Sequence, residues 1–437
     1  MTLALLIAIL FVTVNPSSNS EKYWPQWRGP VANGVAPLAN PPLQWSEEKN
    51  IRWKIEIPGK GNSSPIVWGD RIYLTTAIAT DKAVAPPAAQ ESGNSRRRGI
   101  APTNVQKFVL LALSRRDGKI IWQQTAIEAL PHEGTHPDGT WASNSPITDG
   151  EHIFADFGSR GIYGYDMSGK LLWKKDLGDM TTRNGFGEGS SPALHGNTLV
   201  VNWDHEGGSF MVALDKRTGK ELWRVNRDEP TTWATPLVVM HAGRPQVIVN
   251  ATNRVRSYDL ANGNLIWECS GTTLNAIPSP VAAEGMVYVT AGFRGSALFA
   301  IRFAGAQGDL SNSAAVVWKY DQDTPYVPSP LLYDGKLYFL KVNSGILSCF
   351  NAKTGEPYYS RQRLESIANI YASPVGAAGR VYLVGRDGAT LVIKNSESFE
   401  VLATNKLDDG IDASPALVDN EVYLRGRKFL YCIAGTR

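Results

Sequence analysis

Cysteine and net charge are both scarce in this 437-residue chain. The three cysteines, Cys269, Cys349 and Cys432, are odd in number and widely spaced, which excludes a disulfide framework as the organising feature. Their surroundings look like strands and predict buried, inert thiols, although one disulfide stays open if the protein is exported. The 44 basic and 41 acidic residues give a formal charge of +3, too small to indicate binding to nucleic acid or to a membrane surface.

Long apolar runs are also rare. Residues 3–14, LALLIAILFVTV, form a run of twelve, too short to span a bilayer comfortably and typical of the core of a secretory signal peptide. We therefore expect a signal peptide at residues 1–20, an exported protein in the periplasm or outside the cell, and no transmembrane domain. No Lys or Arg precedes the run, so an uncleaved interfacial anchor is the alternative.

The chain repeats one short phrase, a hydroxyl residue followed by proline, eight times. The prolines are Pro65, Pro146, Pro192, Pro236, Pro280, Pro330, Pro374 and Pro415, each preceded by Ser, except that Thr235 precedes Pro236. Most spacings fall between 41 and 50 residues, and the first is 81. Residues 80–106, rich in Pro, Ala, Ser and Arg without apolar periodicity, account for that excess and predict a disordered-like loop insertion.

Each repeat predicts four short antiparallel strands. Proline cannot donate a ladder hydrogen bond and belongs at the start of a strand, and the Asp-Gly or Glu-Gly pairs that follow suit hairpin turns. An aromatic residue recurs on the outermost strand, four residues after a glycine in most repeats, where it would pack one unit on the next. These expected docking residues are Trp53, Trp122, Trp173, Trp223, Trp267, Trp318 and Tyr359.

Repeats of this length with four strands are the signature of a β-propeller. The last unit ends at Arg437 without its fourth strand, whereas NIRWKIEIP, residues 50–58, is an orphan strand before the first repeat. An open ring would leave unpaired strand edges, which soluble proteins avoid. The sequence therefore predicts an all-β, eight-bladed propeller at residues 21–437, a single domain and a monomer, closed by its N-terminal strand.

Particular motifs resemble a known family. ALDKRTGKELW, residues 213–223, is similar to the tryptophan-docking motif of quinoprotein-type propellers, and LALSRRDGKIIW and SYDLANGNLIW are weaker versions. The chain thus resembles PQQ-like (pyrroloquinoline quinone-like) propeller repeat proteins over residues 45–437. WPQWRGP and the run beginning TPYVPSPLLYDGKLY resemble an exported bacterial subgroup to which no enzyme activity is generally assigned. This resemblance implies a fold more strongly than a function.

The resemblance implies two alternative functions, each represented by a known group of relatives. The propeller subunit of the outer-membrane barrel-assembly machinery is non-enzymatic and holds partners through its loops. The quinoprotein alcohol and glucose dehydrogenases bind PQQ and calcium on the ring axis; the alcohol dehydrogenases typically have an adjacent cysteine pair over the quinone. No two cysteines are adjacent here, and Glu188 and Asn144 are only single candidates for a calcium site. We therefore expect no cofactor, with PQQ and calcium under the enzyme alternative only.

Propeller geometry assigns the turns to two faces. The turns after the first and third strands of each blade are short, whereas the face with the blade-to-blade connections collects long and unusual loops. Because binding usually resides on variable loops of a rigid scaffold, we expect it there. The candidate residues for a ligand or partner are Trp141, Asn144, Arg183, Glu188, Trp233 and Tyr326. The aromatic residues among them could instead fill the channel.

HEGTHPDGTW, residues 132–141, offers His132, His136 and Asp138 as candidate ligands for a divalent metal. Gly134 and Pro137 indicate a loop, so the alternative is that these side chains only stabilise it. The favoured function is an exported, non-catalytic scaffold that binds a protein or glycan through its long-loop face. The alternative is a PQQ-dependent dehydrogenase with a degenerate axial site.

Overall fold

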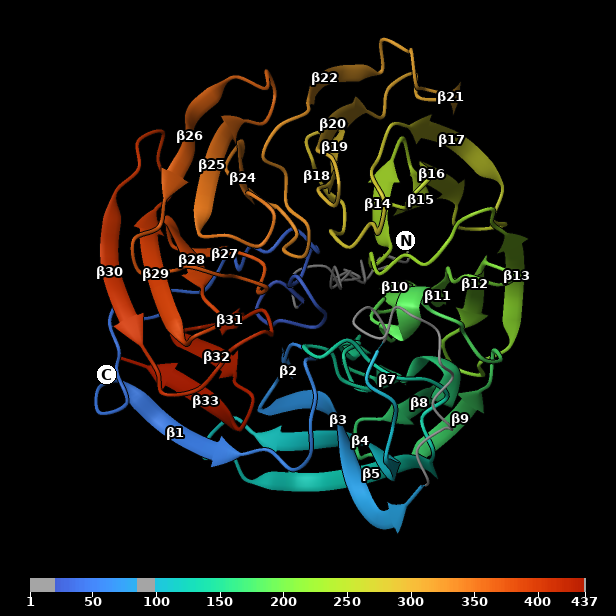
Figure 1. The fold of residues 1–437 in the computed structure, drawn as a ribbon, viewed down its shortest axis with the longest axis vertical. Coiled ribbons are helices and arrows are strands. Elements are labelled where there is room, and N and C mark those ends of the chain that lie inside the picture. The colour runs from blue at the N-terminus through green and yellow to red at the C-terminus, as the bar shows by residue number, and fades with distance from the viewer. Residues whose placement is uncertain (1–19, 85–98, 436–437) are drawn as a thin grey trace, which may run out of the picture.

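Each copy of the repeated phrase opens a short innermost strand, and eight sheets with four antiparallel strands each, one of them extended by a fifth short strand, form a ring (Figure 1). The structure is a computed structural model that describes residues 20–84 and 99–435. The expected signal peptide therefore lies outside the described residues, except for Ser20. In Figure 1 the ring closes as the sequence predicts, which confirms the eight-bladed propeller. No helix in the described ranges is long and apolar enough to cross a membrane.

The strands follow the chain from the inside of each blade to its outside. Blades 1 and 2 contain β2 (Ile66–Trp68), β3 (Arg71–Ala83), β4 (Asn104–Ser114), β5 (Ile120–Ala129), and β6 (Ile147–Thr148), β7 (His152–Asp156), β8 (Ile162–Asp166), β9 (Leu171–Lys175). Blades 3 and 4 contain β10 (Ala193–His195), β11 (Thr198–Trp203), β12 (Phe210–Asp215), β13 (Glu221–Asn226), and β14 (Leu237–His241), β15 (Arg244–Val249), β16 (Arg254–Asp259), β17 (Leu265–Ser270).

The second half of the ring repeats this pattern. Blades 5 and 6 contain β18 (Val281–Ala283), β19 (Met286–Ala291), β20 (Ala297–Arg302), β22 (Val316–Tyr320), and β23 (Leu331–Tyr333), β24 (Lys336–Leu340), β25 (Ile346–Asn351), β26 (Pro357–Arg363). Blades 7 and 8 contain β27 (Val375–Ala377), β28 (Arg380–Val384), β29 (Ala389–Lys394), β30 (Val401–Lys406), and β31 (Ala416–Val418), β32 (Glu421–Arg425), β33 (Phe429–Ala434), β1 (Ile51–Glu56). β21 (Gly308–Asp309) pairs in parallel with β17, and two 3-10 turns are η2 (Gly158–Arg160) and η3 (Arg183–Gly185).

The expected docking tryptophans lie over the glycine of the following blade. A Cβ atom added to Gly118 would approach the Trp53 ring to 2.8 Å. The same relation holds for the pairs Trp122–Gly169, Trp173–Gly219, Trp223–Gly263 and Trp318–Gly355. Four of these indoles, in Trp53, Trp173, Trp223 and Trp318, also donate to a backbone oxygen of the next blade at 2.8–2.9 Å. The glycine is thus needed for close approach as well as for the turn.

Two predicted docking positions differ from this pattern. Trp267 pairs through its backbone with Gly308 of β21, an extra strand that follows the outer edge of blade 4. Tyr359 packs edge-on against Phe399 of blade 7, with the ring centroids 5.8 Å apart. In both cases an insertion or a larger side chain of the next blade replaces the usual glycine.

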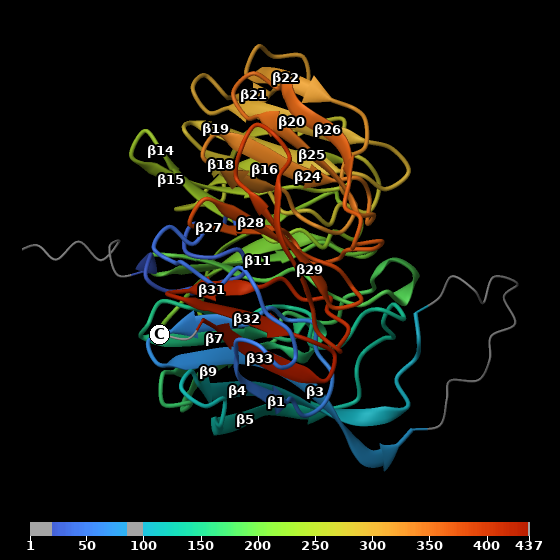
Figure 2. The same ribbon diagram turned by 90° about the vertical axis from the view of Figure 1, so that its left-hand side faces the viewer.

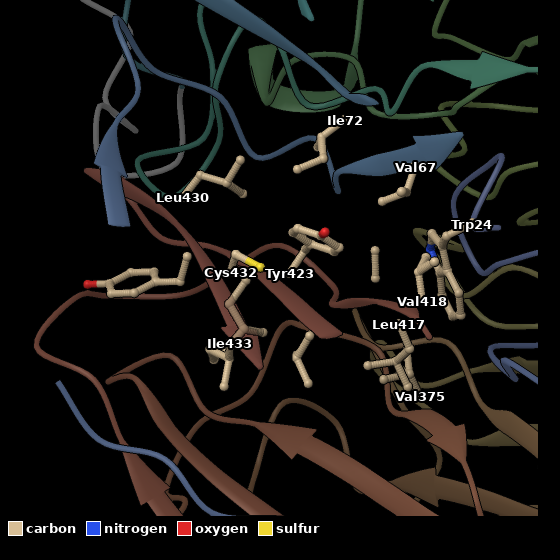
Figure 3. Packing of buried hydrophobic residues seen from close by; sticks show 14 of the residues in the cluster. Trp24, Val67, Ile72, Val375, Leu417, Val418, Tyr423, Leu430, Cys432 and Ile433 are labelled. Carbon is tan, nitrogen blue, oxygen red and sulfur yellow. The ribbon is translucent and has the colours of Figure 1, made fainter. Parts of the chain in front are cut away.

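β1 completes the last blade by pairing antiparallel with β33, with Trp53 opposite Cys432. Figure 3 shows the core at this closure, where Tyr423 and Cys432 of blade 8 pack near Ile72 of blade 1. At its edge, Glu421 of β32 forms ion pairs with Arg52 of β1 and, at 2.7 Å, with Arg115 of blade 1. Apolar packing and paired charge therefore join the two ends of the chain.

The insertion at residues 80–106 is less irregular than the sequence predicts. β3 continues to Ala83 and β4 begins at Asn104, so both ends of the segment belong to a long ribbon that extends beyond the other blades (Figure 2). The ends of β3 and β4 contain polar residues such as Thr80 and Gln106 and lack an apolar pattern, so the sequence did not indicate strands there. A two-stranded ribbon that leaves the core has no face to bury and needs no such pattern. Residues 85–98 lie outside the described residues.

All three cysteines are buried and free, as the strand-like surroundings predict. Burial raises the pKa of each thiol, to about 12 for Cys349 and Cys432. The disulfide that the sequence left open is not formed.

Candidate functional site

The face with the blade-to-blade connections has a funnel on the ring axis, with a volume of about 250 Å³. Its walls come from the long connections, and its base comes from the residues that precede the repeated prolines. We call it the axial funnel. Its lining includes Trp27, His136, Asp138, Phe186, Glu188, Trp233, Ile277, Tyr326, Val327, Tyr371 and Asp412 together with six of the repeated hydroxyl residues.

The repeated hydroxyl residues explain why the phrase recurs. Each accepts a hydrogen bond from the backbone N–H of its counterpart in the preceding blade, with N–O distances of 2.8–3.1 Å. The series closes on itself, because Ser414 donates its N–H to Ser64. We call this circle the hydroxyl ring: Ser64, Ser145, Ser191, Thr235, Ser279, Ser329, Ser373 and Ser414. Thr235, the one exception to Ser, preserves the hydroxyl and with it the circle.

The N-terminal segment closes the other end of the channel. Residues 23–36, the N-terminal plug, lie near the centre of the ring in Figure 1. Trp24 forms two backbone hydrogen bonds with Val67 of blade 1, at 2.8 and 3.0 Å, and the guanidinium of Arg28 donates to the carbonyl oxygens of Pro330 and Pro374. Trp27 lines both the axial funnel and a cavity of about 10 Å³ that also contacts Arg28. Among the described residues, the plug therefore lies across the end of the channel opposite the long-loop face.

Two predicted aromatic residues form the funnel wall and are held in place. The Trp233 indole donates to the backbone oxygen of Gly187 at 2.7 Å, which links the connection into blade 4 to the connection into blade 3. Tyr326 stacks on Phe293 with the ring centroids 4.8 Å apart. Burial raises the pKa of the Tyr326 phenol, and the nearby charge of Arg183 opposes this effect. Arg183 itself does not line the funnel.

Charged groups at the funnel mouth are paired across distant blades. Asp138, in the connection from blade 1 to blade 2, forms an ion pair with Arg386 of blade 7 at 2.7 Å and accepts a hydrogen bond from Tyr371 at 3.0 Å. Arg386 also lies over the Tyr371 ring, 3.9 Å from its centroid, and pairs with Asp412. Burial opposes ionisation of Asp138, but the hydrogen bond and charge of Arg386 lower its pKa overall.

A smaller cavity of about 30 Å³, the side pocket, adjoins the funnel and is lined by Trp141, Asn144, Glu133, Asp156 and Glu188 among others. Glu188 belongs to both cavities, and its carboxylate accepts hydrogen bonds from the backbone and hydroxyl of Ser159. Burial raises the pKa of Glu188 to about 8 and that of Asp156 to about 7. Glu188 is therefore mostly a neutral carboxylic acid at pH 7.

The three residues predicted as metal ligands do not form one group within the described residues, although a carboxylate oxygen of Asp138 lies 3.8 Å from the His136 ring nitrogen. His132 pairs with Asp179, whereas the His136 ring nitrogen accepts the backbone N–H of Asp138, whose carboxylate is held by Arg386. Within residues 20–84 and 99–435, the only group with three His, Cys or carboxylate ligand atoms within 4.8 Å of one another is Asp149, Glu151 and His152. That group lies at the β6–β7 turn, away from the funnel.

Of the residues predicted to bind a ligand or partner, Glu188, Trp233 and Tyr326 line the axial funnel, Trp141 and Asn144 line the side pocket, and Arg183 lines neither. Of the candidate metal ligands, His136 and Asp138 line the funnel and His132 lines the side pocket. Nothing in the sequence indicated that two cavities are present. Sequence reasoning missed the hydroxyl ring, Trp27, Phe186, Tyr371, Arg386 and Asp412. The ring had a visible signal, since a hydroxyl precedes proline in all eight repeats. Each of the other five residues occurs in one loop only, so no repetition in the sequence marks it.

Comparison with solved structures finds the same fold at low sequence identity. BamB from Moraxella catarrhalis has 14% identity and a TM-score of 0.52, with 82% of this chain and 96% of that chain covered. The computationally designed Ika8 protein has 12% identity and a TM-score of 0.59, with coverages of 87% and 99%. The quinohemoprotein alcohol dehydrogenase ADHIIG from Pseudomonas putida HK5 has 12% identity and a TM-score of 0.55, with coverages of 96% and 81%.

Comparison with curated proteins finds no match. The family model described as outer membrane protein assembly factor BamB matches residues 106–360 and 212–434, which together make up most of the chain. With its eight blades of PQQ-like repeats, the chain belongs to the family of the outer membrane protein assembly factor BamB.

Proposed function

We propose that the protein is an exported, non-catalytic scaffold that holds a protein partner against its long-loop face, with the axial funnel as the binding site. The observation that carries the proposal is a funnel on the long-loop face, with Trp233 and Tyr326 fixed in its wall. Aromatic side chains that are already ordered lose little conformational entropy on binding and are enriched at the energetic centres of protein interfaces. The family match to an assembly factor supports the same conclusion.

The paired charges at the mouth also suit a protein partner. Asp138, Arg386 and Asp412 satisfy one another, so the mouth keeps its shape without a ligand. A partner would then meet a fixed surface rather than order a loop, which lowers the cost of association. A glycan that stacks on the same aromatic residues is the other ligand that this surface could accommodate.

The resemblance to quinoprotein dehydrogenases suggests PQQ and calcium as an alternative, but the residues present do not fit that pair. Calcium takes six to eight oxygen ligands. The oxygens of Glu133, Asp156 and Glu188 form no group of three within 4.8 Å in the described part of the chain. The cysteines lie in separate blades and not as an adjacent pair over the funnel. The raised pKa values of Glu188 and Asp156 are the one feature that favours a catalytic site.

The test is crosslinking in the native host. A photoreactive amino acid replaces Tyr326 in the funnel or, as the control, Met240, which is 55% exposed near the turn between β14 and β15. We expect a protein adduct of defined mass at position 326 that is absent at position 240 and is lost in a Trp233→Ala background. An adduct resistant to protease but cleaved by glycosidases would assign a glycan instead. Dye reduction by purified protein given PQQ, calcium and alcohols would refute the non-catalytic proposal.

A further inference from the structure

The hydroxyl ring has donors that the protein does not use. Each ring oxygen accepts a backbone N–H, but none of the eight hydroxyl groups donates to an acceptor within the described residues. Six of them, all except Ser279 and Ser329, line the axial funnel. The base of the funnel therefore presents six hydroxyl groups of the ring, with donors that the described residues do not use, to a cavity open to solvent.

Buried positive charge lies behind this circle. Arg28 is 2% exposed, and its guanidinium donates to three backbone oxygens, two of which belong to the prolines that follow Ser329 and Ser373. Its Nε atom has no hydrogen-bond partner. Arg28 also lines the small cavity beneath the ring together with Thr235. No carboxylate in the described ranges pairs with it, so its charge is not neutralised by the protein.

A second buried arginine repeats this arrangement beside blade 1. Arg425 is 3% exposed, and it donates to the carbonyl and hydroxyl oxygens of Ser63, which precedes the ring residue Ser64. It too has no carboxylate partner within residues 20–84 and 99–435. Burial lowers the pKa of both arginines to about 9, so both remain charged at neutral pH. Buried charges are normally paired with an opposite charge, whereas these two guanidinium groups are hydrogen-bonded to neutral oxygens only. Two positive charges without a counter-charge therefore lie behind the hydroxyl ring, although neither arginine lines the funnel itself.

The acidic residues of the funnel do not supply that anion. Asp138 and Asp412 are held at the mouth by Arg386, and Arg427 pairs with Asp412 as well. Glu188 is turned toward Ser159 and is mostly neutral at pH 7. The base of the funnel thus has hydroxyl donors, no unpaired carboxylate among the described residues, and buried positive charge behind it, below a wall of aromatic rings.

We propose that the base of the axial funnel binds a carboxylate group, carried on a flat apolar body that packs against Trp233 and Tyr326. The two oxygens of a carboxylate carry several lone pairs and can accept hydrogen bonds from more than one hydroxyl of the ring. Hydrogen bonds to a charged acceptor are also about twice as strong as hydrogen bonds between neutral groups. The buried arginines supply the complementary charge. This inference deepens the proposed function, because the carboxylate can be the chain end of a protein partner or a free small acid.

Calorimetric titration of the full chain tests the inference with matched probes. The small acid 3-phenylpropionate is compared with 3-phenylpropanamide, and acetyl-Gly-Gly-Tyr with a free carboxyl end is compared with its C-terminal amide. We expect saturable binding of an acid and at least tenfold weaker binding of its amide. Binding of the small acid assigns a free acid as a sufficient ligand, whereas binding of the peptide acid alone assigns a partner's chain end.

Two ring variants separate binding from stability. Ser191→Ala and Ser329→Ala each remove one acceptor of the hydroxyl ring, but only Ser191 lines the funnel. We expect similar losses of thermal stability, a several-fold loss of carboxylate affinity for Ser191→Ala, and none for Ser329→Ala. Equal affinities for acid and amide, equal effects of the two variants on affinity, or no saturable binding would overturn the inference. A crosslinked partner at Tyr326 would still stand in each of these cases.

Discussion

The substitution Thr235→Val tests whether the hydroxyl ring holds the blades together. Thr235 accepts the backbone N–H of Ser191 at 3.1 Å, and Ser191 is only 5% exposed. Valine has nearly the shape of threonine but no acceptor, so the N–H of Ser191 becomes a buried donor without a partner. Such a donor costs about 1–3 kcal/mol. The control Thr235→Ser keeps the hydroxyl, as the other seven repeats do, and we expect it to be close to neutral.

The expected shift in melting temperature is small because the chain is long. An unfolding entropy of roughly 2.1 cal/mol/K per residue gives roughly 0.9 kcal/mol/K for the whole chain, so Thr235→Val lowers Tm by about 1–3 °C. Differential scanning calorimetry resolves such a shift, and urea denaturation gives the free energy independently. If Thr235→Val and Thr235→Ser unfold alike, the ring hydrogen bonds do not contribute to stability and the reasoning is refuted.

Three further predictions concern ring closure, buried charge and pH. Trp53→Ala removes a 9%-exposed indole that joins blade 8 to blade 1. We expect urea denaturation to show a free energy of unfolding lower by about 3–5 kcal/mol. An unchanged value would mean that the ring closes in another way. Asp204→Asn weakens a fully buried ion pair with Arg227, at 2.7 and 3.0 Å, and should lower the free energy of unfolding by about 3–5 kcal/mol. The control Glu400→Gln, at an exposed ion pair, should lower it by less than about 1 kcal/mol. Equal losses in urea denaturation would contradict the role of burial. The pKa of Glu188 is about 8 in the folded protein and about 4.3 in the unfolded chain, so the folded state binds more protons between these pH values. The free energy of unfolding should therefore fall as pH rises from about 4.3 to about 8. Glu188→Gln should flatten this dependence, and an unchanged slope would refute the raised pKa.

The architecture could be predicted because its signals are local and repeated. A proline that cannot donate opens each inner strand, and the Asp334–Gly335 pair shows the positive φ angles, 49° and 70°, that the hairpin chemistry requires. Eight copies make each weak signal stronger. The missing fourth strand of the last repeat then identifies the strand around Trp53 as its completion, since no other strand is left over.

The candidate site could be predicted only in part. Position before the repeated proline placed Trp233 and Tyr326 at the funnel, because every such connection leads to the axis. His132, His136 and Asp138 were candidate metal ligands by residue type, but the four-residue spacing of the two histidines would align them only on a helix, and the segment is a loop. The carboxylate of Asp138 instead meets Arg386, 248 residues away in the sequence.

The number of blades, the hairpin turns, the recurring aromatic residue on the outer strand and the strand that closes the ring could all be read from the amino-acid sequence. All of these depend on residues within one repeat or on the repeat itself. The folded protein was needed to show that the eight hydroxyls form a circle, that Trp27 and Arg28 fill one end of the channel, and that Glu188 is buried beside Asp156. The physical reason is that these contacts join side chains from different blades at the axis. Their energies depend on burial and unpaired charge, which no local pattern of residues records.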